Sequence, residues 1–341
     1  MAWTRGETPA PVTVEWDLSN RCVLGCQDCH FAHTHVRGPW AMRPRVLPMA
    51  FESTGDLADT SLVMSTLEDM LRHGVRSIVW SGGGEPTTHP DWLLIVGHAK
   101  WLGLRQGMYT CGGLLNKEHG GKLGRAADWV VVSLDAPDAT SYAAEKGVTE
   151  SRFDAAVDGI RNLVGHSATV GVSFLLHADN WTRCKDMLAL SRSLGATYTT
   201  FRPAVKTSPD RPSVPLDTSW IALATDRTYR TVLQQVALEP DVEMDMERFR
   251  AYGSWNGHGY DECSAIQLHT TITPDGRVWV CPQRRGVTAI GDLRVESFDE
   301  IWGRHPRSFS VDEGCRAMCR LHPVNEAMVS IRAPRAHEAF I

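Results

Sequence analysis

The sequence has little that would attach the chain to a membrane or export it. None of its apolar runs approaches the roughly 18 residues needed to cross a bilayer. The opening MAWTRGETPAP lacks the apolar segment of a secretory signal. These absences predict a cytoplasmic protein with no membrane partner.

The chain also lacks an excess of charge of either sign. Lys and Arg number 35 against 40 Asp and Glu, which gives a formal net charge of -5. Such a balance indicates no general basic surface for binding phosphates. The basic pieces QRRG at Gln283 and RAPRAH at Arg332 are more simply interpreted as solvated surface. With 341 residues, of which 43% are hydrophobic, the chain suits one large domain with an extension, or two domains.

Cysteine is present in an odd number, nine, and the chain has no export signal, so a disulfide framework is not expected. Three cysteines, Cys22, Cys26 and Cys29, fall within eight residues and have no obvious fourth. A 4Fe-4S cube has four iron corners, so three thiolates would leave one iron open to a substrate. Because three histidines follow in HFAHTH, a zinc ion held by three cysteines and one histidine stays open as an alternative.

Short β-rich runs recur in the first two hundred residues, with amphipathic segments between them. Their largely apolar character is typical of parallel strands that are covered on both faces. Six strand-helix repeats predict a parallel α/β sheet or a partial barrel, in which the chemistry gathers on loops after the strands. The runs begin at Val12, Ser77, Gly107, Trp129, Val170 and Thr197.

A glycine segment follows the second run. It consists of Gly82, Gly83, Gly84, Glu85 and Pro86. Glycines allow a backbone to approach a ligand closely and to present its amides and carbonyls. No Gly-Lys-Ser/Thr follows and the dinucleotide spacing is absent, so a phosphate loop fits poorly.

The cysteine loop followed by GGEP resembles the radical S-adenosylmethionine (SAM) superfamily over roughly residues 10 to 205. The resemblance implies an α/β fold with a partial (β/α)6 TIM-like barrel, in which the open iron binds SAM and the glycine segment recognises its amino group. It also implies ribose contacts by Ser133 and Asp135. Many relatives hold adenine with an aromatic residue just before the third cysteine. Here that residue is Asp28, and His30 or Phe31 could compensate.

The remaining cysteine group lies near the C-terminus. Cys263 is followed by twelve residues, Gly276, four more residues and Cys281, and later by Cys315 and Cys319. This pattern resembles the twitch extension of radical SAM enzymes, a shortened relative of the SPASM domain. The resemblance implies a second, auxiliary 4Fe-4S cluster with four cysteine ligands. A structural zinc ion with four cysteines stays open.

These segments suggest three parts of the chain. Residues 1–210 form the expected radical SAM core, and residues 211–255 form a linker with a helical segment. Residues 256–341 form a small α+β twitch-like domain, in which IQLHTTITPDGRVWVC is expected to fold as a β-hairpin with Pro-Asp-Gly at its turn.

The resemblance implies an enzyme that takes an electron from flavodoxin or ferredoxin and reductively cleaves SAM to a 5′-deoxyadenosyl radical, which abstracts a substrate hydrogen. We expect an oxidoreductase that uses the auxiliary cluster to dehydrogenate a small polar molecule or a peptide side chain. An epimerase, isomerase or mutase stays open, including one that acts on a nucleotide or a nucleic-acid base. So does a non-catalytic zinc-binding interaction protein.

Three further residues are candidates for the catalytic site. Cys111, in MYTCGG, could return a hydrogen to a substrate radical. Arg202, at the end of the sixth run, could bind a carboxylate of SAM or of the substrate, because its planar fork suits that geometry. His177 follows the fifth run. By contrast, Cys184 is expected in the core, and His89 is expected to brace a turn.

Overall fold

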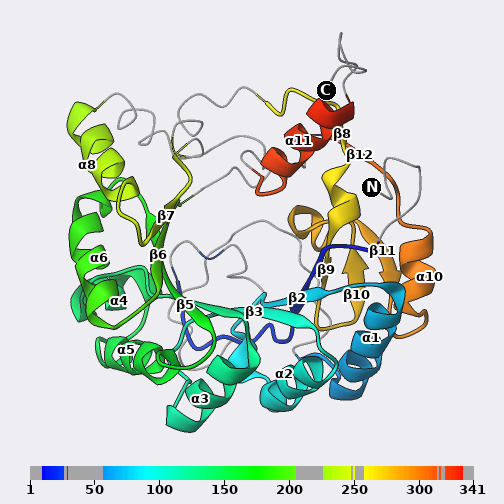
Figure 1. Cartoon of the computed structure of the whole chain (residues 1–341), viewed down its shortest axis with the longest axis horizontal. Helices are drawn as coiled ribbons and strands as arrows, with labels where there is room; N and C mark the ends of the chain where they lie inside the picture. Colours follow the sequence, from blue (N-terminus) through cyan, green and yellow to red (C-terminus); the bar gives the residue numbers. More distant parts are fainter. Residues whose placement is uncertain are drawn as a thin grey trace.

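The fold is known from a computed structural model, which describes residues 10–26, 29, 57–204, 226–246, 249, 257–312, 315 and 319–332. Ten strands form one sheet in the order β11-β10-β9-β1-β2-β3-β4-β5-β6-β7. All neighbouring pairs from β9 to β7 are parallel, whereas β10 runs antiparallel to both of its neighbours. In Figure 1 the sheet curves around the molecule, and helices α1 to α6 lie along its outer side. The expected partial barrel is confirmed.

The six expected strands lie within two residues of the places at which the apolar runs begin. The strands are β1 (Thr13–Asp17), β2 (Ser77–Ser81), β3 (Arg105–Thr110), β4 (Trp129–Ser133), β5 (Thr169–Leu176), β6 (Tyr198–Pro203), β7 (Val242–Met244), β8 (Glu262–Cys263), β9 (His269–Ile272), β10 (Arg277–Trp279), β11 (Ala289–Asp292) and β12 (Phe309–Ser310). The short strands β8 and β12 pair with each other in a separate antiparallel ribbon. Sequence analysis did not predict β7, β8, β11 or β12.

Helices follow most barrel strands. They are α1 (Thr60–His73), α2 (Trp92–Trp101), α3 (Lys117–Ala126), α4 (Ala139–Lys146), α5 (Ser151–Leu163), α6 (Cys184–Ser193), α8 (Arg227–Ala237), α10 (Phe298–Gly303) and α11 (His322–Arg332). Single 3₁₀ turns are η2 (Pro86–Thr88), η3 (Trp181–Arg183), η4 (Ala265–Leu268) and η5 (Pro282–Arg284). No described helix is long and apolar enough to span a membrane.

Local signals set the ends of these helices. The Asp59 side chain accepts a hydrogen bond from the Leu62 backbone N–H and begins α1, and Gly74 ends it in the left-handed conformation. At α10 the Ser297 and Glu300 side chains each accept from the other's backbone N–H and form a capping box. Such caps pair N–H and C=O groups that the helix itself leaves without partners.

Alternation along β1 assigns its two faces to different surroundings. Val14 and Trp16 are buried in the main hydrophobic core, which includes apolar side chains of α1, α2, α3, α5 and α6. Successive side chains of a strand point to opposite faces. Glu15 and Asp17 therefore lie on the inner face of the barrel, and both are buried.

The C-terminal hairpin continues the barrel sheet. Strand β9 pairs with β1 in parallel, with Thr13 opposite His269, and β10 returns antiparallel. The predicted Pro-Asp-Gly turn joins the two strands, and Gly276 takes a positive φ of 80°. The hairpin prediction is confirmed.

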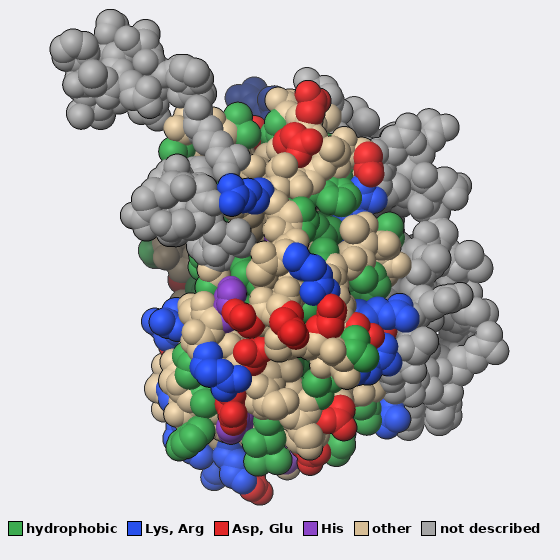
Figure 2. Space-filling view, turned by 90° about the vertical axis from the view of Figure 1, so that its right-hand side faces the viewer, with side chains coloured by type: hydrophobic (Ala, Val, Ile, Leu, Met, Phe, Trp, Pro, Cys, Tyr) green, Lys and Arg blue, Asp and Glu red, His purple; other side chains and the backbone are tan. Residues whose placement is uncertain are grey.

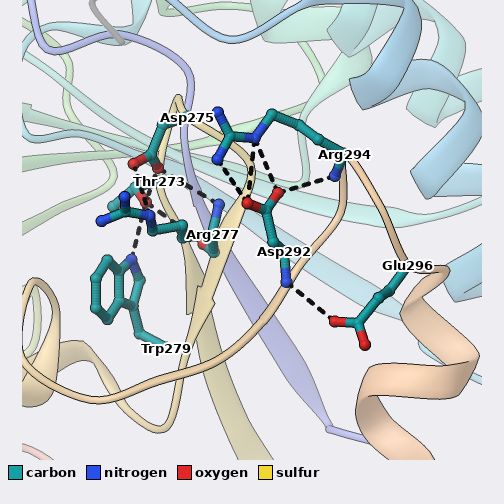
Figure 3. Close-up of polar contacts among 7 residues, drawn as sticks. All are labelled: Thr273, Asp275, Arg277, Trp279, Asp292, Arg294 and Glu296. Atoms are coloured by element: carbon teal, nitrogen blue, oxygen red, sulfur yellow. Dashed lines mark hydrogen bonds and ion pairs between the residues drawn. The ribbon is translucent and has the colours of Figure 1, made fainter. Parts of the chain in front are cut away.

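Polar side chains hold this hairpin turn together. The Thr273 hydroxyl donates to the Asp275 carboxylate at 2.5 Å and accepts from the Trp279 indole N–H at 2.8 Å, as Figure 3 shows. Next to the turn, Asp292 accepts hydrogen bonds from both the backbone and the guanidinium of Arg294. These contacts fix the edge of the sheet beyond β9.

Part of the expected linker, residues 211–225, lies outside the described residues. The boundaries of the three expected parts stay a prediction. The interpretation of QRRG as solvated surface is wrong for its two arginines, because Arg284 and Arg285 are both buried. RAPRAH begins at the last described residue, and the rest of it lies outside.

Surface charge agrees with the balanced composition on the face that can be inspected. Figure 2 views the molecule from the side on which α10 lies in Figure 1. Acidic and basic side chains are interspersed over the described part of this face, without a continuous patch of one sign. The described part of this face therefore shows no extended basic surface.

Packing between neighbouring strands yields a first prediction. A Cβ atom on Gly107 of β3 would lie 2.0 Å from the Trp129 ring of β4. We expect Gly107→Ala to lower the free energy of unfolding by about 1–3 kcal/mol, because the ring has to move. Gly97→Ala in α2 is the control, since its Cβ meets nothing within 4 Å, and it should leave stability equal or raise it by up to about 1 kcal/mol. Urea unfolding measures both, and equal stability of the two variants would refute the packing argument.

Candidate functional site

The cysteine loop after β1 is joined to the glycine segment after β2. The Gly84 backbone N–H donates to the Ser19 carbonyl at 2.9 Å, and the Glu85 N–H donates to the Arg21 carbonyl at 2.8 Å. A Cβ on Gly84 would lie 2.2 Å from the Arg21 carbonyl oxygen. Only glycine fits this approach, which fixes the backbone immediately before Cys22.

The same loop is held on its other side by the end of α4. The Gly25 N–H donates to the Lys146 carbonyl at 2.8 Å. Gly147 follows with a φ of +62°, and a Cβ there would lie 2.5 Å from the Gly25 carbonyl oxygen. The first part of the cysteine loop is therefore held on one side by the contact at Gly84 and on the other by the contact between Gly25 and Gly147.

The Glu85 carboxylate extends this connection to the third strand. It accepts hydrogen bonds from the hydroxyls of Thr87 and Thr110 at 2.6 and 2.7 Å and from the Cys111 N–H at 2.6 Å. Both of its oxygens thus bind the protein itself. The loops after β1, β2 and β3 form one hydrogen-bonded unit, in which the glycine segment contributes backbone and Glu85 contributes rigidity.

The thiols on this loop have the chemistry that an iron-sulfur cluster requires. Cys22, Cys26 and Cys29 form no disulfide and are partly buried. Burial raises the pKa of Cys22, and the neighbouring thiol of Cys26 raises it further. Burial also raises the pKa of Cys26, against the effect of Lys146. Thiols gathered in this way ionise only when a cation compensates them, as bound iron does, so the donor set fits a cluster.

The described residues contain no group of three or more His, Cys, Asp or Glu side chains placed to hold a single metal ion. A cube does not require such convergence, because each cysteine binds a different iron. Asp28, His30 and Phe31, which bear on the expected adenine contact, lie outside the described residues.

A buried ion pair lies beside the cysteine loop. Lys146 of α4 donates to Asp135, which follows β4, and both are almost fully buried. Asp135 has a φ of +60° and also accepts from the Leu175 N–H at 2.7 Å. Burial lowers the pKa of Lys146, but Asp135 and Cys26 outweigh it and raise the pKa above its usual value. Lys146 therefore stays charged next to the thiols.

Other expected site residues lie at the ends of strands, as predicted. Ser133 ends β4 opposite Ser173 and is partly buried. The His177 ring nitrogen Nε2 lies 3.1 Å from the Glu145 carboxylate of α4. Arg202 donates to the Tyr109 hydroxyl at 3.1 Å, and its guanidinium lies 5.3 Å from the centre of that ring.

Cys111, Cys184 and His89 are all buried. Cys111 is buried, and burial together with Glu85 and Cys22 raises the pKa of its thiol well above the usual value. Cys184 is fully buried in the main core, and His89 bonds the Ala58 carbonyl and the Asp91 N–H. The predictions for Cys184 and His89 are confirmed.

Three of the four C-terminal cysteines, Cys263, Cys281 and Cys319, lie in or against a second, smaller core. Burial, together with the thiols of Cys319 and Cys315, raises the pKa of Cys263 to about 11. Burial also raises the pKa of Cys281 to about 12, with Cys319 adding to the rise. The Leu321 N–H donates to the Cys319 sulfur at 3.4 Å.

This second donor set also fits a cluster. Backbone N–H groups of Ala265 and Ile266 favour the Cys263 thiolate, and the Arg284 guanidinium lies 3.8 Å from the Cys315 sulfur. Hydrogen bonds to sulfur are one means by which proteins tune iron-sulfur clusters. Asn325 of α11 is fully buried and accepts from the Ser264 N–H at 2.6 Å, which positions the loop after Cys263.

Sequence reasoning missed several of these residues. Lys146, Glu145 and Asn325 lie in helices, where charged and amide residues are usually solvated, so no local signal separates them from surface positions. Glu15 and Asp17 did carry a signal. A charged residue inside an otherwise apolar parallel strand implies a buried partner.

Comparisons with known proteins agree with this geometry. A family model described as the radical SAM superfamily matches residues 16–190, and one described as an iron-sulfur cluster-binding domain, SPASM, matches residues 263–320. PqqA peptide cyclase of Gluconobacter oxydans (strain 621H) is 26% identical over 312 residues, which cover 87% of this chain and 77% of that protein. Mycofactocin maturase MftC of Mycobacterium ulcerans (strain Agy99) is 27% identical over 87% of this chain and 76% of that protein.

Solved structures support the fold. The structure of Streptococcus suis SuiB bound to precursor peptide SuiA aligns with a TM-score of 0.64 and 16% identity. The alignment covers 87% of this chain and 65% of that chain, so the present chain spans a little less than two thirds of SuiB. The family matches confirm the expected iron-sulfur clusters and SAM as cofactors.

The contact between Gly84 and Arg21 predicts a specific loss of iron. Gly84→Ala should displace the cysteine loop and remove the first cluster, so that reconstituted protein holds about four irons fewer per chain. Gly113→Ala is the matched control, because a Cβ there meets nothing within 4 Å. Iron and sulfide assays under anaerobic conditions measure the difference. Full iron content in Gly84→Ala would contradict the role of this contact.

Asp17 predicts a dependence of stability on pH. Burial raises its pKa to about 7, and Glu15 adds to the rise while Arg285 opposes it. A carboxyl group whose pKa is raised on folding stabilises the protein at low pH, and this contribution is lost as the pH rises through about 7. Relative to Asp17→Asn, which does not titrate, the wild type should lose unfolding free energy between pH 5 and pH 8. Urea unfolding of both proteins across this range tests it, and parallel curves would exclude the raised pKa.

Proposed function

Because the chain belongs to the radical SAM superfamily, we propose that it oxidises a side chain of a peptide substrate, with the auxiliary cluster as electron acceptor. The observation that carries the proposal is the pair of cysteine groups: three thiols in the loop after β1, and four in the C-terminal region, whose strand β9 pairs with β1 in the same sheet. The names of the relatives favour a peptide over a small polar molecule, since they describe a peptide cyclase and a protein bound to a precursor peptide.

The zinc-binding interaction protein finds no support in the family matches. Neither PqqA peptide cyclase nor mycofactocin maturase MftC is named for a nucleic-acid substrate. Flavodoxin or ferredoxin stays our proposed source of electrons.

When bound, the first cluster and SAM supply a 5′-deoxyadenosyl radical. Cys22, Cys26 and Cys29 would hold that cluster, and the backbone of Gly82, Gly83 and Gly84 would receive the ammonium group of SAM. Glu85 and Pro86 would keep this segment in place through η2 and the Glu85 hydrogen bonds. A close-packed backbone suits this work, because it presents carbonyls without moving.

The remaining contacts to SAM are proposed from the strand ends. Ser133 and Asp135 would face the ribose, with Asp135 oriented by Lys146 and by the Leu175 N–H. Phe31 would contact the adenine. Cys263, Cys281, Cys315 and Cys319 would hold the auxiliary cluster.

The substrate would lie on the inner face of the barrel. With the first cluster and SAM bound, the site would supply the radical that removes one hydrogen atom from a substrate carbon. Loss of a proton and one electron would then leave the peptide with two hydrogens fewer, and Cys263, Cys281, Cys315 and Cys319 would hold the cluster that accepts the electron. Arg202 would bind a substrate carboxylate, and its place beside the Tyr109 hydroxyl leaves the planar guanidinium oriented. His177, paired with Glu145, would line the same end of the barrel.

A hydrogen-donor role for Cys111 would lead to epimerisation instead. Its buried position beside Glu85 favours this second candidate, because a protonated thiol keeps a hydrogen to donate. The two reactions differ in mass. Oxidation removes two hydrogens, whereas epimerisation leaves the mass unchanged in ordinary water and adds deuterium in heavy water.

Coexpression with short peptides encoded beside the gene, followed by mass spectrometry, tests the proposal. The wild type should yield a peptide lighter by two hydrogens and should form 5′-deoxyadenosine on reduction. Cys22→Ala should abolish both, whereas Cys281→Ala should retain SAM cleavage and lose peptide oxidation. Cys184→Ala, which changes a core cysteine, should retain both. SAM cleavage with every neighbouring peptide left unmodified would argue against peptide oxidation.

A further inference from the structure

Two carboxylates on the inner face of β1 lie in a place where charge is costly. Glu15 is 4% exposed and Asp17 is fully buried. A buried carboxylate requires opposite charge or hydrogen bonds to remain ionised. The groups that surround Glu15 and Asp17 therefore indicate the role of these two carboxylates.

The partners come from the C-terminal region. Arg285 donates to one Glu15 oxygen at 3.0 Å and lies 3.2 Å from Asp17, and its side chain is 2% exposed. Arg320 donates to the other Glu15 oxygen. His269 of β9 lies 3.4 Å from that same oxygen. We call these five residues the β1 charge network.

The two arginines stand next to the C-terminal cysteines in the chain. Arg285 comes four residues after Cys281, just past η5, and Arg320 directly follows Cys319. Glu15 thus receives one guanidinium from each of two segments that supply the auxiliary cluster. The same strand also leads to the first cysteine group, because Cys22 follows Asp17 by five residues.

Charge in the network favours ionised Glu15. Burial alone would raise the pKa of Glu15, but Arg320, His269 and Arg285 outweigh it and hold the pKa well below its usual value. Burial lowers the pKa of His269 and Arg320 adds to the lowering, although the hydrogen bond to Glu15 opposes it. Glu15 therefore offsets part of the positive charge that the two arginines bring to the auxiliary site.

We propose that Glu15, Arg285 and Arg320 are positioning residues that fix the auxiliary cluster against the barrel and set its reduction potential. The inference rests on the proposed function only in assuming that the four C-terminal cysteines hold a cluster. A cluster gains negative charge on reduction, so an unpaired cation nearby favours the reduced state and an unpaired anion disfavours it. Glu15 and the arginines thus act on the potential with opposite signs.

Redox titration of the reconstituted protein, followed by electron paramagnetic resonance in the presence of SAM, tests the assignment. SAM separates the signals because it binds only at the three-cysteine cluster. Glu15→Gln should raise the auxiliary potential, since it removes the negative charge that both arginines share. Arg320→Gln should lower it, and Arg320→Lys should keep it close to the wild-type value. The double variant Glu15→Gln/Arg320→Gln should return toward wild type, because the two changes are coupled.

Arg105→Gln serves as the control for loss of an arginine. Arg105 pairs with Asp128 at 2.5 Å on an exposed part of the barrel, so its removal should leave the potential unchanged. Arg320 is partly exposed, which makes its variants the safer pair if Glu15→Gln fails to fold. A purely structural network would shift the potential in the same direction in both single variants, or not at all, and either result would overturn the proposal.

The outcome is separable from that of the proposed function. The titration requires no substrate, so failure to find an oxidised peptide leaves it intact. If the potentials do not respond while peptide oxidation is observed, only the role of the β1 charge network is lost. Absence of iron at the four C-terminal cysteines would end both.

Discussion

The pairing of β1 with β2 on one side and β9 on the other is the constraint on which both cysteine groups depend. Because β1 leads directly into the first cysteine loop, the position of that loop follows from the register of this strand. Because β9 begins the C-terminal hairpin and pairs with β1, the position of β1 also determines where the second cysteine group lies. A slip of one residue would exchange the faces of β1 and would bring Glu15 and Asp17 into the apolar core.

At the first site, close contacts between backbone segments hold the loops in place, as side-chain packing does elsewhere in the protein. Gly84, Gly25 and Gly147 allow carbonyls and amides of three different loops to meet, and Glu85 ties the ends of β2 and β3 together. The loop that carries the thiols therefore has few alternative positions. Rigid placement would suit a site whose ligands leave one iron open while excluding other donors.

The electrostatic arrangement differs between the two sites. Beside the first group, one buried cation, Lys146, is matched by Asp135. Beside the second group, two arginines share Glu15 and approach Asp17, and a third arginine, Arg284, pairs with Asp312. The second group thus has more ion pairs in its surroundings than the first, with three arginines facing three carboxylates.

The amino-acid sequence by itself determined the six strands, the hairpin and the two cysteine groups, because local spacing and periodicity depend only on residues close together in the chain. The family and its partial barrel came from the resemblance that the cysteine loop and the glycine segment carry. The sequence did not reveal the strand order beyond β6, the insertion of the hairpin beside β1 or the partners of Glu15. Arg285 is the plainest case, since QRRG has the composition of a solvated segment and becomes buried only because β1 presents two carboxylates to it. Contacts between residues some 270 positions apart are decided by the tertiary fold, because no local pattern records which distant charge will meet which.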